Sequence, residues 1–488
     1  MKYRHLLPIL SACFLLGCSE DFLTKEYRNG VAESNFFKDE VDALQALTAV
    51  YDGISQKGVY RESVFVLGSC PSDDIDEKTG DTGDYGFHFK NASDFRWVPD
   101  NPFSRARWFD AYKAVARANT FLERIGAVPM DEQLKKQYAA EAKFLRALYY
   151  WNLTITFGDI PLFTKVLTRD EYVQLARTDK AAVYKQIEDD LNAAIPDLPV
   201  ADSNPVGHVT KGAAIGFLGR IYLYQNKWEL AATTSKQVVD LGRYQLAEDF
   251  ISLFNGKNEN SPEALFEFQA VSFAPGYWTD LTENSIAAMW SPNIGWANWY
   301  TPSEESKTLF KPGDIRRKSV LIVGATPADM IDTDGKGAKP FPSVPMRTEY
   351  FNNASVRKFL PEGKDMAQVD AFDVNYPVIR YGEVLLNYAE ALNESGKSAE
   401  ALVPLNMIRK RAKIAPVTET AQAALRNIIR DERRVELLYE GHRFYDLARW
   451  GLQEEKLKKK GFVKGTHEYW PVPTTELSIM PNLTQYPN

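Results

Sequence analysis

Aromatic side chains are concentrated in one stretch of the sequence that shows little helical or strand periodicity. Four of the 10 tryptophans lie between residues 273 and 300, among tyrosines and asparagines. Flat aromatic faces pack against the C–H bonds of a pyranose ring, while neighbouring amides bond its hydroxyl groups. The stretch therefore predicts a stacking site for sugars. Its expected members are Trp296, Trp299, Tyr300, Trp290, Trp278 and Asn298.

A second candidate site lies earlier in the chain. Trp97 and Asn101 stand between prolines just before a helix that we expect to start near Arg105. A position at the edge of a helical scaffold would suit the rim of a ligand site. For each of these aromatic residues the alternative is that it packs its insertion onto the scaffold. The tryptophans on expected helices are predicted to pack in this way: Trp108, Trp151, Trp228 and Trp450.

Two acidic segments resemble calcium loops only in part. Asp332 and Asp334 open a segment with the spacing of such a loop, but Lys336 puts a cation where an oxygen ligand is needed, and Ser343 replaces the final glutamate. A run between residues 73 and 84 supplies more carboxylates, and we expect it to be a solvated loop. Its members are Asp73, Asp74, Asp76, Glu77, Asp81 and Asp84. We predict no metal site and no cofactor, with Asp332 and Asp334 as weak candidates.

Catalytic motifs are missing from the sequence. It contains neither Gly-x-Ser-x-Gly nor His-Glu-x-x-His, and its 5 histidines are scattered. The segment 396–398 imitates the end of a phosphate loop, but Ala391 occupies the position of the first glycine. The dense charges between 431 and 449 form pairs three residues apart on an expected helix, a spacing typical of structural ion pairs. These pairs are Asp431 with Arg434, Arg433 with Glu436, and Arg443 with Asp446.

The first residues have the form of a lipoprotein signal peptide. Lys2 and Arg4 precede an apolar stretch, and Leu15-Leu16-Gly17-Cys18 ends it with a cysteine. We therefore expect residues 1–17 to be removed, Cys18 to carry lipid, and residues 18–35 to form a lipidated tether. The alternative is a short buried helix with an incidental cysteine.

Composition excludes two further classes of protein. The formal net charge of −7 argues against binding of nucleic acid or other polyanions by bulk charge. Of the 3 cysteines, Cys13 would leave with the signal peptide and Cys18 would be acylated, so only Cys70 would remain. No disulfide can then form within one chain.

Several segments show helical periodicity with plausible ends. Apolar residues recur at spacings of four, three and four from Phe144 to Ile155, and Gly158 ends that pattern. Leu218-Gly219-x-x-Tyr222, followed by Asn226-x-Trp228-x-x-Ala231, has the pattern of a tetratricopeptide helix pair. Residues 388–402 provide a second copy and residues 141–147 a looser third. We predict a mostly α fold, a bundle of helical repeats occupying 36–488 as a single domain, with irregular insertions at about 68–104 and 255–376.

Landmarks spread along the chain resemble the SusD/RagB-like family of outer-membrane nutrient-binding lipoproteins. They comprise the lipobox, residues 140–150, Phe157-Gly158-Asp159-Ile160-Pro161-Leu162, Tyr376 to Glu383, Glu432 to Leu437, Glu440 to Trp450, and Trp470-Pro471-Val472-Pro473. The resemblance implies four tetratricopeptide units, a carbohydrate or peptide ligand, and a place at the cell surface over a SusC-like TonB-dependent transporter. The family's ligand-contacting loops follow no fixed motif, so the resemblance assigns no sugar-binding residue.

Three functions follow from these expectations. The first is a lipid-anchored glycan-binding protein of the outer membrane that delivers oligosaccharide to its transporter. The second is a peptide-capturing or protein-capturing lipoprotein of the same uptake system, since helical repeats commonly bind peptides. The third is a surface glycoside hydrolase, which would need two carboxylates at a defined separation across a cleft. We favour the first, a binding protein and not an enzyme.

Overall fold

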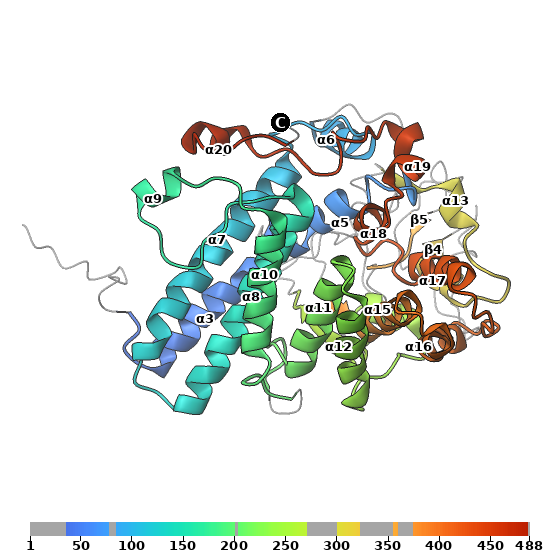
Figure 1. Cartoon of the computed structure of the whole chain (residues 1–488), viewed down its shortest axis with the longest axis horizontal. Coiled ribbons are helices and arrows are strands. Elements are labelled where there is room, and N and C mark those ends of the chain that lie inside the picture. The colour runs from blue at the N-terminus through green and yellow to red at the C-terminus, as the bar shows by residue number, and fades with distance from the viewer. Residues whose placement is uncertain are drawn as a thin grey trace, which may run out of the picture.

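Helices form most of the structure, a computed structural model that describes residues 36–77, 84–200, 204–270, 300–322, 355–359 and 374–486. Four long helices lie side by side on the left of Figure 1. They are α3 (Glu40–Ser55), α7 (Pro102–Arg124), α8 (Glu132–Phe157) and α10 (Lys180–Ala194). The prediction of a mostly α fold is confirmed.

The ends of α8 show how local sequence sets a helix boundary. The side chain of Asp131 accepts a hydrogen bond from the backbone N–H of Leu134 and caps the first turn. Gly158 ends the helix with a φ of 74°, a left-handed conformation that costs a glycine little. The predicted end of this helix at Gly158 is confirmed.

Two helix pairs continue the bundle through the centre of the molecule and towards its right side (Figure 1). The first consists of α11 (Lys211–Tyr224) and α12 (Trp228–Asp240), and the second of α15 (Tyr381–Glu394) and α16 (Ser398–Arg411). A Cβ atom on Gly219 would lie 2.8 Å from Oγ of Ser235, so the close approach of α11 and α12 depends on a glycine. Both predicted tetratricopeptide-like pairs are present.

The remaining helices surround this bundle. The α-helices among them are α4 (Lys57–Tyr60), α5 (Glu62–Gly68), α6 (Asp84–Ser93), α9 (Arg169–Val173), α13 (Glu304–Lys307), α14 (Arg316–Val320), α17 (Gln422–Glu436), α18 (Arg443–Arg449), α19 (Gln453–Leu457) and α20 (Thr474–Ile479). The 3-10 helices are η2 (Ile125–Ala127), η4 (Phe250–Phe254) and η8 (Lys458–Lys460). The first predicted insertion is therefore not wholly irregular, because α6 and the start of α7 lie within it.

Three antiparallel strand pairs join segments that are far apart in the sequence. Strand β1 (Ile75–Glu77) pairs with β3 (Tyr300–Pro302), and β2 (Ala264–Phe268) pairs with β6 (Tyr376–Arg380). Strand β4 (Leu321–Ile322) pairs with β5 (Ser355–Val356). The second predicted insertion therefore contains short strands as well as irregular chain, and its segments are tied to the helical bundle.

The tryptophans on helices divide into two groups. Trp108 and Trp151 are buried in the core, as predicted. Trp228 and Trp450 are half-buried, and Nε1 of Trp450 donates a hydrogen bond to Glu390. All four contribute to packing or to a structural hydrogen bond.

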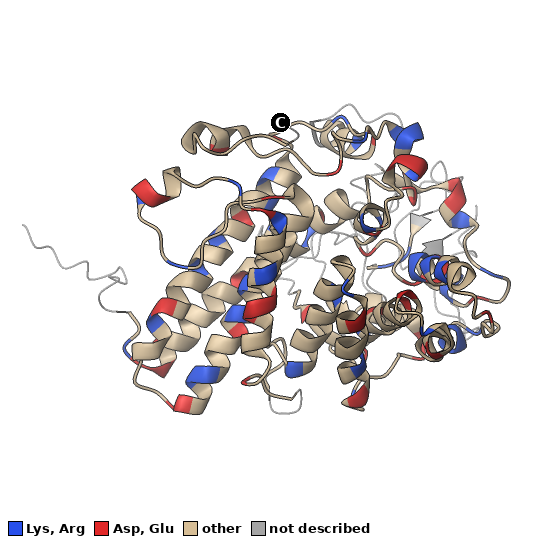
Figure 2. Cartoon of the chain, in the orientation of Figure 1, with Lys and Arg blue, Asp and Glu red and all other residues tan. Residues whose placement is uncertain are grey.

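Charged residues of both signs are interspersed over the helices (Figure 2). Within the part of the chain that the structure describes, none of the helices has the length and apolar character needed to span a membrane.

Candidate functional site

Three of the predicted ligand residues converge on helix α6. Nε1 of Trp97 donates to the carbonyl oxygen of Ala92 at 3.0 Å. Nδ2 of Asn101 donates to the carbonyl oxygen of His88 at 3.3 Å. The hydroxyl of Tyr300 donates to the carbonyl oxygen of Phe89 at 3.0 Å. The structure thus brings these residues together, as supports of one helix.

Asn101 is fully buried and caps the start of α7. Its Oδ1 accepts a hydrogen bond from the backbone N–H of Phe103 at 3.1 Å. With its oxygen at the cap and its amide on α6, the side chain has no exposed atom for a ligand. The prediction that Asn101 contacts the ligand is corrected here, because the proline that follows it makes this position a helix start.

Tyr300 is also part of the core. Its ring is 2% exposed and packs edge-on against Phe65 and Phe89, with ring centroids 5.7 and 5.5 Å away. A sugar cannot stack on a ring that other side chains cover almost completely. The stacking role predicted for Tyr300 is therefore corrected as well. The alternative of packing the insertion onto the scaffold holds for this residue.

Trp97 keeps part of its ring exposed. One face stacks on Trp470, with centroids 4.1 Å apart and planes 10° from parallel, and the edge of Phe444 packs nearby. A ligand could therefore contact only the remaining surface of Trp97. Its role stays a prediction.

Helix α6 exposes an aromatic residue that the sequence did not single out. Phe87 is 53% exposed, and its ring meets that of His88 at 5.5 Å. The signal was present in the sequence as Phe87-His88-Phe89, where only one of the two phenylalanines can face the core. The remaining predicted residues, Trp278, Trp290, Trp296, Asn298 and Trp299, lie outside the described residues.

The prediction of a solvated acidic loop is wrong for its first two residues, whereas Asp76 is exposed and Asp81 lies outside the described residues. Asp73 and Asp74 are buried, Asp73 pairs with Arg443 at 2.7 Å, and Asp74 pairs with Arg434 at 2.7 Å. These carboxylates hold β1 against α17 and α18. Asp332 and Asp334 lie outside the described residues, and within the described ranges no three His, Cys, Asp or Glu side chains are arranged to hold a metal ion.

The charges between 431 and 449 are structural, but their predicted partners were wrong. Arg433 pairs with Asp446 at 2.8 Å, and Glu436 pairs with Arg380 at 2.7 Å. Burial alone would raise the pKa of Glu436, but Arg411, Arg380 and Arg316 outweigh it and hold the pKa well below its usual range. Arg434 and Arg443 reach Asp73 and Asp74, as given above. A spacing of three between opposite charges predicts a charged helix. Contacts with distant segments determine which ion pairs form.

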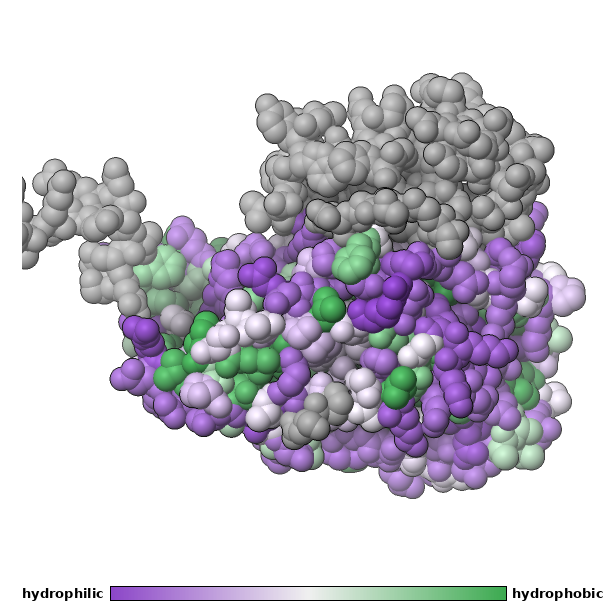
Figure 3. All heavy atoms as spheres, turned by 90° about the horizontal axis from the view of Figure 1, so that it is seen from above, coloured by the Kyte–Doolittle hydropathy of each residue, from purple (hydrophilic) through white to green (hydrophobic). Residues whose placement is uncertain are grey.

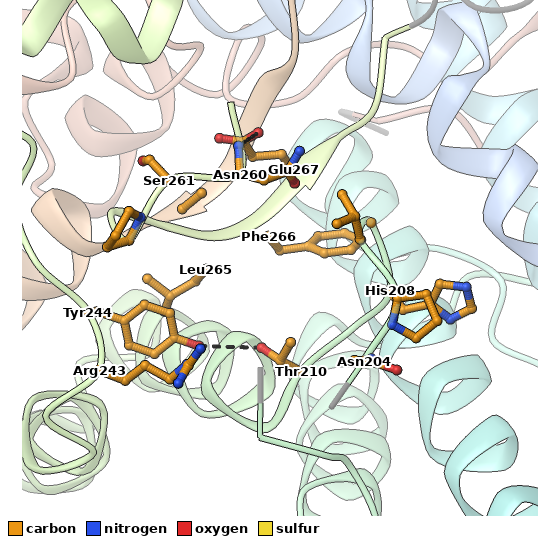
Figure 4. A pocket seen from close by; sticks show the side chains of 15 residues that line it. Asn204, His208, Thr210, Arg243, Tyr244, Asn260, Ser261, Leu265, Phe266 and Glu267 are labelled. Atoms are coloured by element: carbon orange, nitrogen blue, oxygen red, sulfur yellow. Dashed lines mark hydrogen bonds between the residues drawn. The ribbon is translucent and has the colours of Figure 1, made fainter. Parts of the chain in front are cut away.

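A pocket of about 250 Å³ with both polar and apolar lining lies where the chain before α11 meets β2 (Figure 4). Figure 4 shows His208 and Asn204 on one side of it, Arg243 and Tyr244 on the other, and Glu267 on the strand above. Nδ1 of His208 forms a hydrogen bond with Oε2 of the buried Glu141 at 2.8 Å. No local sequence pattern predicts this pocket, because its lining comes from three separate segments.

Glu267 is the acidic residue of this pocket. Burial raises its pKa to about 7, although the backbone N–H of Asn260 and Nδ2 of Asn375 donate to its carboxylate at 2.9 and 3.0 Å. Four pockets among the described residues are each lined by a single acid: Glu267, Glu248, Glu468 or Glu440. None of them offers the two facing carboxylates that glycoside hydrolysis requires.

Comparison with known proteins decides the family. Residues 345–488 match the model of the SusD family, and residues 21–223 match a family described as starch-binding and associating with the outer membrane. A solved laminarin-binding SusD-like protein is 30% identical, with a TM-score of 0.78 over 92% of this chain and 100% of its own. The chain belongs to the SusD family.

Two curated relatives of this SusD-family protein span most of its length. A SusD-like protein of Formosa agariphila is 28% identical over 100% of both chains. The starch-binding protein SusD of Bacteroides thetaiotaomicron is 22% identical over 76% of each chain. A solved surface glycan-binding protein of Bacteroides fluxus has the same fold, with a TM-score of 0.75 over 92% of this chain and 100% of its own at 24% identity.

Seen from the side that carries α6, α19 and α20, the described surface of the SusD-family protein interleaves hydrophobic and hydrophilic areas (Figure 3). Such a mixture suits a ligand that offers both C–H faces and hydroxyl groups.

Proposed function

We propose that this protein is a glycan-binding lipoprotein of the outer-membrane surface, which captures oligosaccharide and delivers it to a TonB-dependent transporter. The observation that carries the proposal is the 30% identity over the whole length of a laminarin-binding protein. The starch-binding relative extends the support to a second glucan. Binding rather than catalysis is favoured because these relatives are named for the glycans that they bind, and none of the four pockets described above has the paired acids of a hydrolase.

The ligand site is proposed to combine α6 with the aromatic insertion. The described chain resumes at Tyr300, where β3 pairs with β1 and Tyr300 is bonded to α6. Trp296 and Trp299 precede this junction by a few residues in the sequence, and Phe87 is the exposed aromatic of α6. Stacking by Trp296, Trp299 and Phe87 would supply the apolar contacts of a sugar site.

The experiment is binding of the chain that starts at Ser19 to immobilised laminarin, starch, other glycans and peptides. We expect retention on one class of glycan, with a loss of at least about tenfold in affinity for Trp296→Ala or Trp299→Ala and a smaller loss for Phe87→Ala. Phe109→Ala is the matched control, because Phe109 is an exposed aromatic residue that lies on α7 rather than on α6 or in the aromatic insertion. Retention on peptides alone would replace the glycan with a peptide ligand, and release of sugar products would indicate a hydrolase.

Anchoring is proposed to depend on Cys18, and transport on a partner. In cells, Cys18→Ala should abolish incorporation of labelled fatty acid and release the protein from the membrane fraction. Affinity purification of the lipidated protein from detergent extracts should recover a TonB-dependent transporter. Unchanged lipid labelling in the Cys18→Ala variant would overturn the anchor, and failure to recover any such transporter would overturn the partner.

A further inference from the structure

The segment 456–464, at the end of α19, is strongly basic. It contains five lysines, and no acidic residue occurs between Lys456 and His467. Because the whole chain carries a formal net charge of −7, this segment concentrates positive charge against the overall balance. Figure 2 shows basic residues at the end of α19. Lysine-rich runs of this length are typical of surfaces that bind sulfated glycans and other polyanions.

Contacts with the end of α6 hold this segment in place. The ring of Phe462 packs edge-on against Phe95, with centroids 5.4 Å apart. A Cβ atom on Gly461 would lie 2.8 Å from the carbonyl oxygen of Asp94, so the two backbones approach closely. Nζ of Lys460 is turned inward and donates to two backbone carbonyl oxygens in and just before β1. The basic segment is therefore part of the ordered surface beside α6.

Three of its lysines are exposed on either side of these contacts, Lys458, Lys459 and Lys464. None of the three forms an ion pair within the described ranges of the chain. Of the acids around them, Glu454 is exposed. The others have partners or charges of their own nearby: Glu77 with Lys90, Asp94 with Arg96, Glu455 with Lys456, Glu468 with the backbone N–H of Gly465, and Asp76 with the charge of Lys460.

The exposed lysines lie next to the aromatic residues of the proposed ligand region. His467 belongs to the same turn as Lys464, and its ring packs on Trp97 with centroids 5.5 Å apart. Phe87, the exposed aromatic of α6, precedes Asp94 by about 10 Å along the helix axis. An oligosaccharide of a few residues spans that length, so a chain stacked on Phe87 brings its substituents to the lysines.

We propose that the glycan bound beside α6 is acidic, and that Lys458, Lys459 and Lys464 bind its carboxylate or sulfate groups. The inference rests on the proposed function, because it names the class of glycan for that same site. Each ammonium group is a point charge with three donors on a flexible stem, which suits anionic groups repeated along a chain without one fixed geometry. Attraction between exposed charges is screened by salt, so the preference for an acidic glycan falls as ionic strength rises.

Glycans that share a backbone and differ in charge provide the test. The first pair is laminarin and sulfated laminarin, and the second is methyl-esterified polygalacturonate and polygalacturonate. For the chain that starts at Ser19, we expect the charged member of one pair to bind at least about tenfold more tightly in about 50 mM salt, and to lose most of this preference at about 500 mM. Equal affinity within both pairs would overturn the inference and leave the proposed function standing. Absence of binding to every glycan would overturn the proposed function itself.

Replacement of the three exposed lysines by glutamine should reduce affinity for the charged glycan to that for its neutral partner. This variant is Lys458→Gln, Lys459→Gln and Lys464→Gln. The matched control removes three exposed lysines on and beside α16, which lies at the lower edge of Figure 1 whereas α6 lies at its upper edge: Lys397→Gln, Lys410→Gln and Lys413→Gln. The control should keep the full preference. Equal losses in the two variants would indicate attraction by bulk charge, and equal binding of polyglutamate would indicate an acidic protein partner. Either result would contradict an acidic-glycan site at these lysines.

Discussion

The hydroxyl of Tyr300 donates a hydrogen bond to the carbonyl oxygen of Phe89 at 3.0 Å, and this contact joins the end of the aromatic insertion to α6. Because β3 also pairs with β1, the chain returns from the insertion in a fixed position beside α6. The sequence separation of the two residues is 211 positions, so only tertiary structure brings them together.

Tyr300→Phe tests whether this contact positions α6. The variant keeps the packed ring but removes the hydroxyl that donates to the carbonyl oxygen of Phe89, so the free energy of unfolding should fall by about 1 kcal/mol. Chemical denaturation measures this change. Glycan affinity should fall as well, by a few fold, because α6 carries Phe87. A variant with unchanged stability and unchanged affinity would show that the hydrogen bond positions nothing.

Asn101→Ala should destabilise the protein by about 1–2 kcal/mol, because it removes the cap of α7 and the hydrogen bond to α6. Asn101→Asp keeps an oxygen for the cap and loses the amide donor, so it should recover part of the loss. Thermal and denaturant unfolding of the two variants separate the two contributions. Full stability in Asn101→Ala would contradict the structural role assigned to this residue.

Trp470→Ala should cost about 3–5 kcal/mol in stability, because Trp470 is fully buried and supports one face of Trp97. Trp97→Ala should cost less, since its ring is half-buried. The double variant should lose less than the sum of the two, with a coupling of about 1 kcal/mol from the stacked pair. Strictly additive losses would argue against that stacking.

Glu267 makes stability depend on pH. Its pKa is about 7 in the folded protein and near its ordinary value of 4.5 in the unfolded chain, so the folded state binds the proton more tightly. The contribution to stability is fully present below about pH 4.5 and is lost as the pH rises through about 7. Glu267→Gln should remove this dependence. Between pH 4.5 and 8 its free energy of unfolding should therefore rise, relative to that of the wild type, by on the order of 2–3 kcal/mol. Parallel pH profiles of the two proteins would contradict the raised pKa.

The helical framework could be predicted because the residues that set the ends of each helix lie next to it in the sequence. Asp131 and Gly158 mark the ends of α8, and Thr210 caps α11, in each case through residues within one turn of the helix. The helix pair around Gly219 could be recognised for the same reason, since the small residue and the large ones it separates recur at fixed spacing.

Roles that depend on distant contacts could not be predicted in this way. Tyr300 has the same side-chain chemistry as an aromatic residue that stacks on a sugar, and it differs in that Phe65 and Phe89 cover its ring. Trp470 covers one face of Trp97 in the same way. Likewise, Arg434 lies three residues from Asp431 in the sequence but binds Asp74, which is 360 positions away. Burial and partner choice were decided by packing between segments that no local pattern connects.

The most direct test of the central claim is calorimetric titration of the glycan retained on the panel into the wild-type chain and into Trp299→Ala, Phe87→Ala and Phe109→Ala. The account predicts saturable binding to wild type and Phe109→Ala, affinity reduced by at least about tenfold in Trp299→Ala, and an intermediate loss in Phe87→Ala. Equal affinity in all four folded proteins would contradict a ligand site formed by α6 and the aromatic insertion.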